Sequence, residues 1–376
     1  MQDPIVIPLR GDHLDDQISP ERFAARRPTI RMPVVAAIIC NYNQKDFLED
    51  SIASMLGQTY PHMEYVVVDD CSTDGSAEVV EDVLVRIGKG CVRFIRHQQN
   101  RGQMAAMLTG LDATTAPFVA WLDADDIWLP EFIERHVAHH LNPRVNAALS
   151  TSNMAVIDAH GTLIAGADPS MSTTSPLREQ VRSFPIKPVA LERYGKGVDF
   201  SSVAPLGPVF INRQYEAWVW SPTSGMVFRR AAIEPIRPSC CEGLRTCADH
   251  YLARFGHVVG GTIWMNETLG CYRCHGSNGF AKRAVCGDGP IGVHPKHITE
   301  EGNYQFAAKL REGTTLVNIL APQSLRKLLL HIGRSTRAIP KILANRELRR
   351  AVRFMDRLRL LRRYVAARLR LSSQGR

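Results

Sequence analysis

The stretch that decides the fold is PFVAWLDADDIWLP, residues 117–130. Its first half, residues 118–122, is an apolar run of the length typical of a strand buried on both faces. Three carboxylates follow this run, those of Asp123, Asp125 and Asp126. Ligands in an open α/β sheet bind at the carboxyl ends of the strands, so we expect a functional site here.

Closely spaced carboxylates repel each other unless a cation lies between them. Mg²⁺ and Mn²⁺ are hard cations that take oxygen ligands and leave positions for water or phosphate oxygens, so the D-x-D pattern of Asp123 and Asp125 is typical of such a site. The alternative is a solvated acidic turn ahead of a helix that opens at Pro130, because Asp is common at helix caps and turns. The pattern alone leaves both interpretations open.

Apolar runs and helical patterns alternate from residue 34 to residue 130. Strands are expected at residues 34–40, 65–68, 92–95 and 118–122, and helices at 46–56, at 77–87 and from the NRG motif at 100–102 to residue 113. This alternation predicts a doubly wound, mainly parallel α/β sheet of Rossmann-like type.

The alternation weakens beyond Pro130. We expect a helix to residue 140, a strand pair over 147–157, a strand within TSGMVFRR (223–230), a helix over CADHYLARFGHV (247–258), a strand over TIWMNETLGCYR (262–273) and helices from residue 300 onward. Residues 166–210 are rich in Pro, Ser and Gly, which predicts a long surface loop that borders the site.

Charge is unevenly distributed along the 376 residues. The net charge of +9 comes from residues 322–376, which hold 16 Lys and Arg residues against Glu347 and Asp356, whereas residues 1–321 hold 30 basic and 35 acidic groups. We therefore expect a loosely ordered leader (1–32), a main domain (33–299) and a helical, basic C-terminal extension (300–376). No apolar stretch reaches roughly 18 residues and the N-terminus lacks the apolar core of a signal peptide, so a cytoplasmic location is expected.

The nine cysteines are an odd number in a chain without a secretion signal, so free thiols are expected. Six of them fall between residues 240 and 286, which raises the question of a zinc site. Their spacing fits no ordinary zinc ribbon, so small buried hydrophobic side chains are the preferred interpretation.

Four motifs in this order resemble the inverting family 2 glycosyltransferases of GT-A fold: VVAAIICNYN (34–43), VVVDDCSTDGS (66–76), NRG (100–102) and WLDADDIWLP (121–130). TSGMVFRR, CADHYLARF and YRCHGSN (272–278) are similar to the acceptor-side strand, catalytic helix and distal His loop of that family. The resemblance implies a nucleotide-sugar half over residues 33–130 and an acceptor half over residues 131–299.

The resemblance also implies roles for individual residues on the donor side. The nucleotide base and ribose are expected against Cys40, Asn41, Tyr42 and Asn43. Asp70 is expected to accept a hydrogen bond from the base imide, which an ionised carboxylate does strongly. The remaining expected positions are Arg101 and Gly102 near the phosphates, Asp123 at the ribose or donor sugar, and Asp125 at a Mg²⁺ or Mn²⁺ ion on the diphosphate, with Asp123 and His275 as further metal ligands.

Asp249 corresponds to the general base of the family. An inverting transfer needs an acceptor hydroxyl that loses its proton while it attacks the anomeric carbon from the face opposite the leaving diphosphate. The family more often has Glu-Asp where this chain has Ala248-Asp249. The alternative for Asp249 is a helix N-cap, and Glu242 is then the substitute base.

The same resemblance places Arg273, His275 and Asn278 over the diphosphate. Trp218 and Trp220 either stack on an acceptor sugar or belong to the core. The Q-x-x-R-W motif and the membrane helices of the processive synthases are missing from this sequence, so we expect one sugar to be transferred per encounter.

Two functions are consistent with these patterns. The first is a metal-dependent hexosyltransferase that moves a sugar from a UDP- or dTDP-sugar to a glycan or lipid-linked acceptor in cell-surface polysaccharide or glycolipid synthesis. The second is a non-catalytic scaffold of the same fold whose basic tail binds anionic lipid or nucleic acid. Intact carboxylates at positions 70, 123, 125 and 249 favour the enzyme.

The tail carries an apolar stripe at three- and four-residue steps, with arginines between its members: Leu348, Val352, Met355, Leu358, Leu361, Val365 and Leu369. Such a helix is predicted to lie peripherally on the anionic inner face of the cell membrane. No nucleic acid is expected, because phosphate binding gains nothing from the stripe. The alternative is a helix packed on the main domain with its arginines in solvent.

Overall fold

The computed structural model describes residues 31–88, 90–142, 144–166, 208–213, 218–276, 278, 296–312 and 314–374. Most of the predicted leader and of the predicted loop at 166–210 lies outside the described residues. Residues 33–376 form one compact unit, and the predicted boundary at residue 300 falls inside it, within a helix.

Four parallel strands form the N-terminal half of the sheet, in the order β3-β2-β1-β4. They are β1 (Val35–Asn41), β2 (Met63–Asp69), β3 (Val92–Arg96) and β4 (Phe118–Asp123). The helices between them are α2 (Lys45–Leu56), α3 (Ser76–Ile87) and α4 (Gln103–Asp112). Each predicted strand and helix of this half is confirmed to within a few residues. Because the strands are parallel, their carboxyl ends meet at one edge of the sheet.

The second half of the sheet mixes strand directions. After β4 the order continues with β9 (Met226–Arg229), β6 (Leu149–Asp158), β10 (Thr262–Cys274) and β5 (Ile127–Trp128). β9 is antiparallel to both β4 and β6, whereas β10 is parallel to β6. β7 (Leu163–Ala165) pairs with β6 and β8 (Val209–Ile211) pairs with β10. The strand pair expected over 147–157 was wrong, because these residues form the single strand β6.

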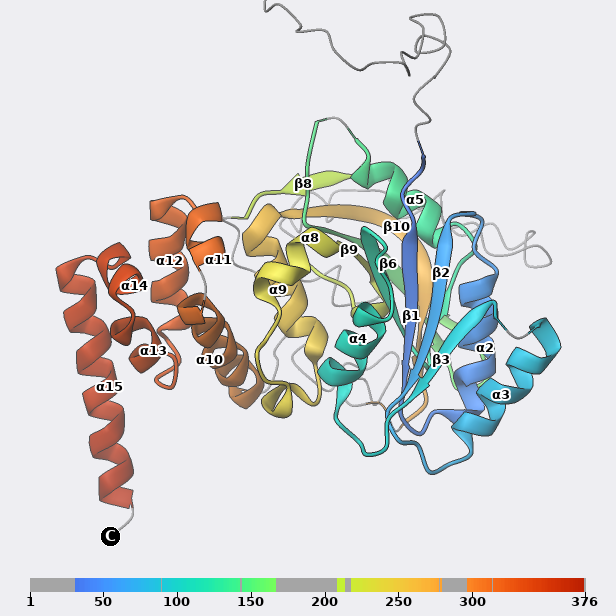
Figure 1. Cartoon of the computed structure of the whole chain (residues 1–376), viewed down its shortest axis with the longest axis horizontal. Coiled ribbons are helices and arrows are strands. Elements are labelled where there is room, and N and C mark those ends of the chain that lie inside the picture. The colour runs from blue at the N-terminus through green and yellow to red at the C-terminus, as the bar shows by residue number, and fades with distance from the viewer. Residues whose placement is uncertain are drawn as a thin grey trace, which may run out of the picture. The chain divides into compact units, whose positions relative to one another are not determined.

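Helices cover both faces of the sheet, as Figure 1 shows, so the predicted doubly wound α/β class is confirmed. Alternate residues of β1 point to opposite faces: Ala36 and Ile38 belong to one buried cluster, and Val35 and Ile39 to the other. The first cluster includes side chains of α4 and of α9 (Ala248–Gly260), and the second includes side chains of α2, α3 and α5 (Phe132–His140).

The C-terminal part is helical, as predicted. It comprises α10 (Lys296–Glu312), α11 (Thr314–Ile319), α12 (Pro322–Ile332), α13 (Ile339–Ala344), α14 (Arg346–Ala351) and α15 (Phe354–Gln374). Buried side chains of these helices belong to the same cluster as those of α4 and α9, and the helices lie beyond α9 in Figure 1. None of the described helices is both long enough and apolar enough to cross a membrane.

The apolar stripe of the tail is divided between two helices. The backbone is extended at Val352, which ends α14 before α15 begins at Phe354. Leu348 and Val352 are fully buried, whereas Met355, Leu358, Leu361 and Val365 are exposed, and so is Phe354. The prediction of one continuous stripe was therefore wrong, since its first part packs in the core.

Candidate functional site

The D-x-D segment lies at the carboxyl end of β4 and is held between two halves of the sheet. β5 directly follows it and pairs with the end of β10, with Cys271 opposite Ile127. This pairing brings residues 123–126 next to residues 273–275. Asp126 is fully buried and supports the turn: its Oδ2 accepts from the Ser224 hydroxyl at 2.7 Å, and its Oδ1 accepts from the Arg273 amide at 2.9 Å.

Asp125 faces the distal His loop. Its Oδ2 lies 2.9 Å from Nε2 of His275 and 3.5 Å from Nδ2 of Asn278. The backbone amide of His275 donates to Oδ1 of Asn278 at 2.8 Å, and the His275 ring lies 4.6 Å from that of Phe47. The structure therefore brings Asp125 together with His275 and Asn278, which lie 150 and 153 residues later in the sequence.

The buried Arg273 side chain forms hydrogen bonds with other groups of the protein. This side chain is 2% exposed. The guanidinium donates to the Asp125 carbonyl at 2.8 Å and to the Ala159 carbonyl at 3.2 Å, and it lies 3.0 Å from Oδ2 of Asp50. This side chain fastens the His loop to the D-x-D turn, and the predicted place over the diphosphate is not available to it in this arrangement.

Asp123 lies in a buried and negatively charged environment. Burial, together with the nearby carboxylates of Asp125 and Asp249, raises the pKa of its carboxyl to about 8. Asp249 is half-buried in the first turn of α9, so the predicted base and the D-x-D motif occupy one site. The N-cap residue of α9 is Cys247, which excludes the alternative that Asp249 is the N-cap. Glu242 is exposed in a short 3-10 turn.

Gln103 connects Asp123 to the helix that carries Asp249. Its amide Nε2 donates to Oδ1 of Asp123 at 3.4 Å, and its Oε1 accepts from the backbone amide of Ala248 at 3.0 Å. The preceding Gly102 has a positive φ of 88°, and a Cβ there would lie 2.6 Å from Cα of Arg245. Only glycine permits this close approach of the two segments.

The second Asp-containing strand end organises the NRG loop. The Asp70 carboxylate is buried and accepts from the backbone amides of Arg101 at 2.8 Å and Gly102 at 2.7 Å. Its Oδ1 also lies 2.6 Å from Nδ1 of His97, whose Nε2 lies 3.0 Å from the Thr109 hydroxyl. Asp70 thus holds the loop that is expected near the phosphates.

Of residues 40–43 at the end of β1, some form hydrogen bonds within the protein and others are exposed. The Asn41 amide donates to Asp69 at 2.8 Å and to Ser72 at 3.0 Å, and Asn43 has a positive φ of 55°. Tyr42 is 47% exposed. Cys40 of β1 pairs with Val68 of β2 and with Asp123 of β4, so it lies between the two strand ends. Burial and the nearby charges of Asp123 and Asp70 raise the pKa of its thiol.

Two further site predictions concern aromatic and sulfur-containing side chains. Trp220 is 3% exposed and donates to the Thr262 hydroxyl at 2.9 Å, so it belongs to the core. Trp218 is half-buried and stacks on His250 with ring centroids 5.4 Å apart, next to Asp249 in the chain. The eight described cysteines are free, and Cys286 lies outside the described residues.

Comparisons with known proteins agree with this arrangement. The sequence model described as glycosyl transferase family 2 matches residues 36–159. An uncharacterized glycosyltransferase from Nostoc sp. is 30% identical over 252 residues, which are 66% of this chain and 67% of that protein. The chain belongs to glycosyltransferase family 2.

Two other proteins are similar to parts or all of this transferase. The Escherichia coli UDP-Glc:α-D-GlcNAc-diphosphoundecaprenol β-1,3-glucosyltransferase WfgD is 28% identical over 113 residues, which are 30% of this chain and 43% of WfgD. The crystal structure of Staphylococcus aureus TarS residues 1–349 with UDP covers 91% of this chain and 92% of TarS 1–349 at 14% identity, with a TM-score of 0.46.

The chemistry of the transferase's D-x-D site fits a divalent cation with few protein ligands. Among the residues that the structure describes, no group of three or more His, Cys, Asp and Glu side chains is arranged to hold a metal ion. Asp123 and Asp125 nevertheless place excess negative charge in a buried region, and the raised pKa of Asp123 reflects that charge. Mg²⁺ and Mn²⁺ are commonly held by one or two carboxylates plus substrate phosphates, which suits this pair.

Several residues of the transferase's site carry no signal in the sequence. Gln103 and His97 stand alone in ordinary polar segments, and only the fold brings them to Asp123 and Asp70. Ser224 lies in the TSGM motif, whose polar residues indicate a site, yet its bond to Asp126 depends on the pairing of β4 with β9.

Proposed function

We propose that this transferase moves one hexosyl group from a nucleoside diphosphate sugar to an acceptor hydroxyl with inversion at the anomeric carbon. The observation that carries the proposal is the position of Asp249: it lies in the first turn of α9, close enough to Asp123 to raise the pKa of that carboxyl. A base on the helix that faces the donor-side carboxylates is the arrangement that a single displacement needs.

Asp249 takes the proton from the acceptor hydroxyl as the oxygen attacks. Asp125 and Asp123, with His275 hydrogen-bonded to Asp125, would hold the Mg²⁺ or Mn²⁺ ion. When bound, the ion supplies positive charge for the leaving diphosphate. Gln103 holds Asp123 in a fixed position relative to the start of α9, because it forms a hydrogen bond with each. Burial of Asp126 keeps the turn rigid, so the two ligand carboxylates stay at the strand end.

On the donor side, the segment at the ends of β1 and β2 is proposed to bind the base and ribose of a uridine or thymidine diphosphate sugar. Cys40 and the chain from Asn41 to Asn43 lie there, and so does Asp70. The Asp70 carboxylate already accepts from Arg101 and Gly102, so donor binding and the position of the NRG loop are coupled in this proposal. A pyrimidine donor is supported by WfgD, whose donor is UDP-Glc.

The acceptor side is proposed to take a glycan or a lipid-linked sugar in cell-surface polysaccharide or glycolipid synthesis. WfgD acts on a GlcNAc-diphosphoundecaprenol. Trp218, stacked on His250 beside Asp249, is a candidate platform for the acceptor ring, because aromatic faces suit the apolar faces of sugars.

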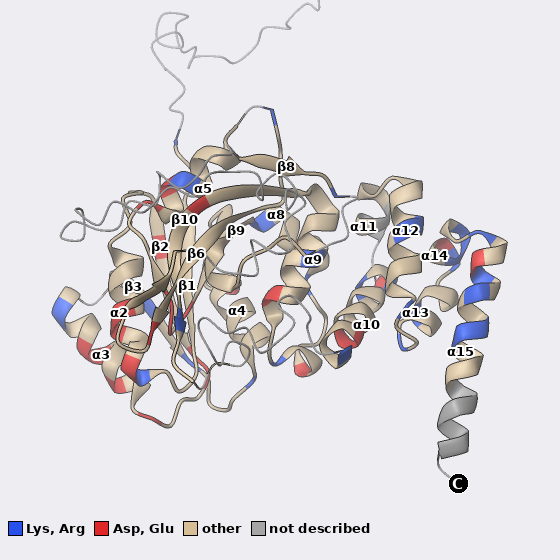
Figure 2. Ribbon diagram, turned by 180° about the vertical axis from the view of Figure 1, so that it is seen from behind, with Lys and Arg blue, Asp and Glu red and all other residues tan. Residues whose placement is uncertain are grey.

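Peripheral attachment to an anionic membrane is part of the proposal. Phe354, Leu358, Leu361 and Val365 recur along α15 at four-, three- and four-residue steps, and each is exposed. Arginines surround this face, and Figure 2 marks basic residues in blue along the described part of α15. A helix with an apolar face and Arg on its sides suits the boundary between headgroups and acyl chains. Such attachment would place the site near a lipid-linked acceptor.

The test of the proposed function is incubation of the purified protein with a panel of nucleotide sugars, with release of the nucleoside diphosphate as the readout. We expect turnover with a UDP- or dTDP-sugar that EDTA abolishes and Mn²⁺ restores. The Asp125→Asn variant should keep the fold and lose metal-dependent binding, since an amide retains the shape but not the charge. Equal Mn²⁺-dependent turnover in this variant would remove Asp125 as a ligand. A protein that binds UDP with Mn²⁺ in a thermal-shift assay but turns over no donor would support the scaffold alternative.

A further inference from the structure

A cavity of about 450 Å³ lies on the side of α4 away from the D-x-D turn. One wall is a face of α4 with Arg101 of the loop before it, a second is the loop after residue 236, and a third is Lys309 of α10. Its size is that of a small-molecule site. None of the residues that line it belongs to the carboxylate cluster of the D-x-D site.

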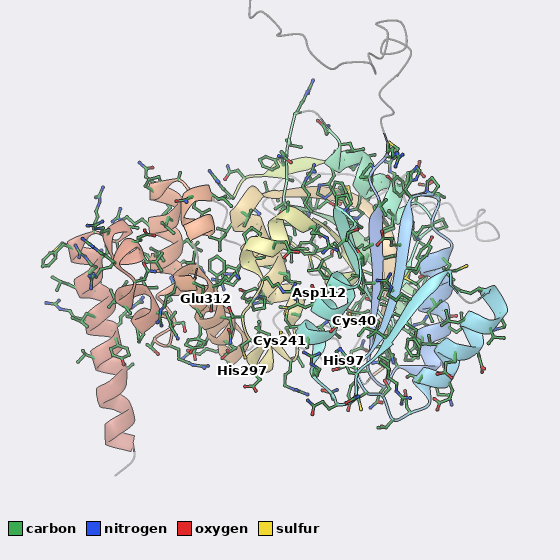
Figure 3. The ribbon with its side chains drawn as sticks, viewed as in Figure 1. Cys40, His97, Asp112, Cys241, His297 and Glu312 are labelled. Atoms are coloured by element: carbon green, nitrogen blue, oxygen red, sulfur yellow. The ribbon has the colours of Figure 1, made fainter. Side chains whose placement is uncertain are left out.

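The cavity is lined by an excess of positive charge. Arg101, Arg237 and Lys309 reach it from three separate segments, whereas Asp112 is the single carboxylate among the lining residues. Asp112 is paired with Arg237 through two hydrogen bonds of 2.6 and 2.5 Å. In the described part of the chain, the side chains of Arg101 and Lys309 form no ion pair. Figure 3 labels both Asp112, at the end of α4, and Cys241, in the segment before α9.

The cavity is connected to both halves of the catalytic site. Arg101 belongs to the loop whose amides bind Asp70. Two residues later, Gln103 forms hydrogen bonds with Asp123 and with the start of α9, the helix that carries Asp249. On the same wall, Thr109 of α4 contacts His97, which contacts Asp70. An anion in the cavity would therefore lie beside the segments that hold donor and base, but outside the donor's own carboxylate site.

We propose that this cavity binds a phosphate or diphosphate group. Two guanidinium groups and an ammonium group around one space match the charge and the hydrogen-bonding capacity of phosphate oxygens. The group could belong to the acceptor or to a free phosphate compound. The acceptor is favoured by the link between the cavity and the base helix, a preference that rests on the proposed transfer to a phosphate-bearing acceptor.

Titration calorimetry with inorganic pyrophosphate, in EDTA and without donor, tests the site directly. The wild-type protein should bind pyrophosphate, and Lys309→Glu should weaken binding about tenfold, because the change removes one attraction and adds one repulsion. Lys327→Glu, the same charge change on an exposed face of α12, should leave the affinity unchanged. Absence of binding to the wild-type protein, or equal weakening in both variants, would overturn the proposal. Arg237→Gln provides a second variant if Lys309→Glu does not fold.

A second measurement distinguishes a phosphate group of the acceptor from a free phosphate compound. It also tests the cavity site separately from the proposed transferase function. If the group belongs to the acceptor, pyrophosphate should compete with a diphosphate-linked acceptor, and Lys309→Glu should raise the KM for that acceptor about tenfold without changing the affinity for UDP and Mn²⁺. Inhibition or activation that does not compete with the acceptor identifies a free phosphate compound. If no sugar is transferred but Lys309→Glu still weakens pyrophosphate binding, the transferase proposal fails and the cavity site stands.

Discussion

Asp249 is the residue to which the proposed function assigns the role of general base. Asp249→Asn keeps the size of the side chain but removes its capacity to accept a proton. We expect kcat to fall by about 10²–10⁴ while donor affinity stays near that of the wild type, as for a positioned base. Glu242→Gln, at the exposed 3-10 turn, is the matched control and should have little effect. Near wild-type transfer by Asp249→Asn together with a slow Glu242→Gln would reverse the two roles.

Gln103 is a positioning residue whose two bonds can be removed together. Gln103→Leu should lower kcat about tenfold, because two hydrogen bonds of roughly 0.5–1.5 kcal/mol each no longer align Asp123 with α9. The KM for the donor should change little. Gln99→Leu, at an exposed site in the loop before α4, is the control. A loss of melting temperature without a change in kcat would indicate that Gln103 serves only the fold.

For single residues, the sequence predicts the carboxylates of the site better than the residues that form hydrogen bonds with them. Asp123, Asp125, Asp249 and His275 stand in motifs with recognisable spacing, and the structure gathers them. Arg273 stands in the same motif, yet its guanidinium is buried against protein carbonyls. A motif records which residue types occur together, whereas the direction of a side chain depends on what the neighbouring strand leaves open.

Among the helices, α4 is packed so closely on the sheet that one position has no room for a side chain. A Cβ on Gly110 would lie 2.3 Å from Cγ2 of Ile38 in β1. Gly110→Ala should therefore lower the free energy of unfolding by about 1–2 kcal/mol, despite the higher helix propensity of alanine. In α9, a Cβ on Gly256 would meet its nearest neighbour at 3.7 Å, which is ordinary contact. Gly256→Ala should be neutral or stabilising by up to about 1 kcal/mol. Chemical denaturation of both variants measures the difference, and equal effects would contradict the packing argument.

The contact between α5 and β6 makes stability depend on pH. Burial lowers the pKa of His140 to about 3 and that of His136 well below its usual value. Both rings lie against the Ser150 hydroxyl, at 2.9 and 2.6 Å. Below pH of about 6.5 the unfolded chain binds protons that the folded chain does not, so stability is lost as pH falls toward 3, by about 1.4 kcal/mol per pH unit for each histidine.

Replacement of one ring tests this dependence. His140→Gln should reduce the slope of unfolding free energy against pH between 6 and 4 by about 1.4 kcal/mol per unit relative to the wild type. Comparison of slopes removes the contributions of carboxyl groups that titrate in the same range. His160→Gln, at an exposed turn, is the control. A wild-type slope in the His140→Gln variant would mean that this ring is protonated in the folded protein.

The elements were predictable to different degrees in the two halves of the sheet. The strands β1 and β4 are continuous apolar runs because each is covered on both faces, and such runs are visible without knowledge of their partners. β2 ends in a buried apolar run, whereas β3 is a short edge strand with Arg93 and Arg96 exposed. The order β9-β6-β10 could not be predicted, since it depends on which strand enters next to β4 and in which direction. The split of the C-terminal stripe escaped prediction for a related reason: periodicity does not reveal that the backbone becomes extended at Val352.

In the whole molecule, α15 packs on the other C-terminal helices through one face and exposes apolar side chains on another. Asp356 is buried and accepts from Arg326 of α12 at 3.0 Å, and Leu360 is 2% exposed. Removal of the whole tail would therefore also remove core residues. Substitution of Phe354, Leu358 and Leu361 by serine should release the protein from anionic liposomes without unfolding it, because these side chains are exposed.

Cosedimentation with liposomes at low salt measures this release. Val85→Ser, which removes an apolar residue that is 65% exposed on α3, is the control and should leave binding intact. The serine variant should still turn over a water-soluble donor, since none of the three residues lies near the strand ends. If the triple variant sediments as the wild type does, α15 is not the membrane contact.

The hydrogen bonds around Asp69, Asp70 and the NRG loop join mainly residues between positions 41 and 109, and Arg245 also donates to Asn100. The base helix, the His loop and two basic residues of the cavity all come from later in the chain. Replacement of the segment downstream of β6 would thus change the helix that carries Asp249 and the His loop together, while most of the bonds at the proposed donor side would stay in place.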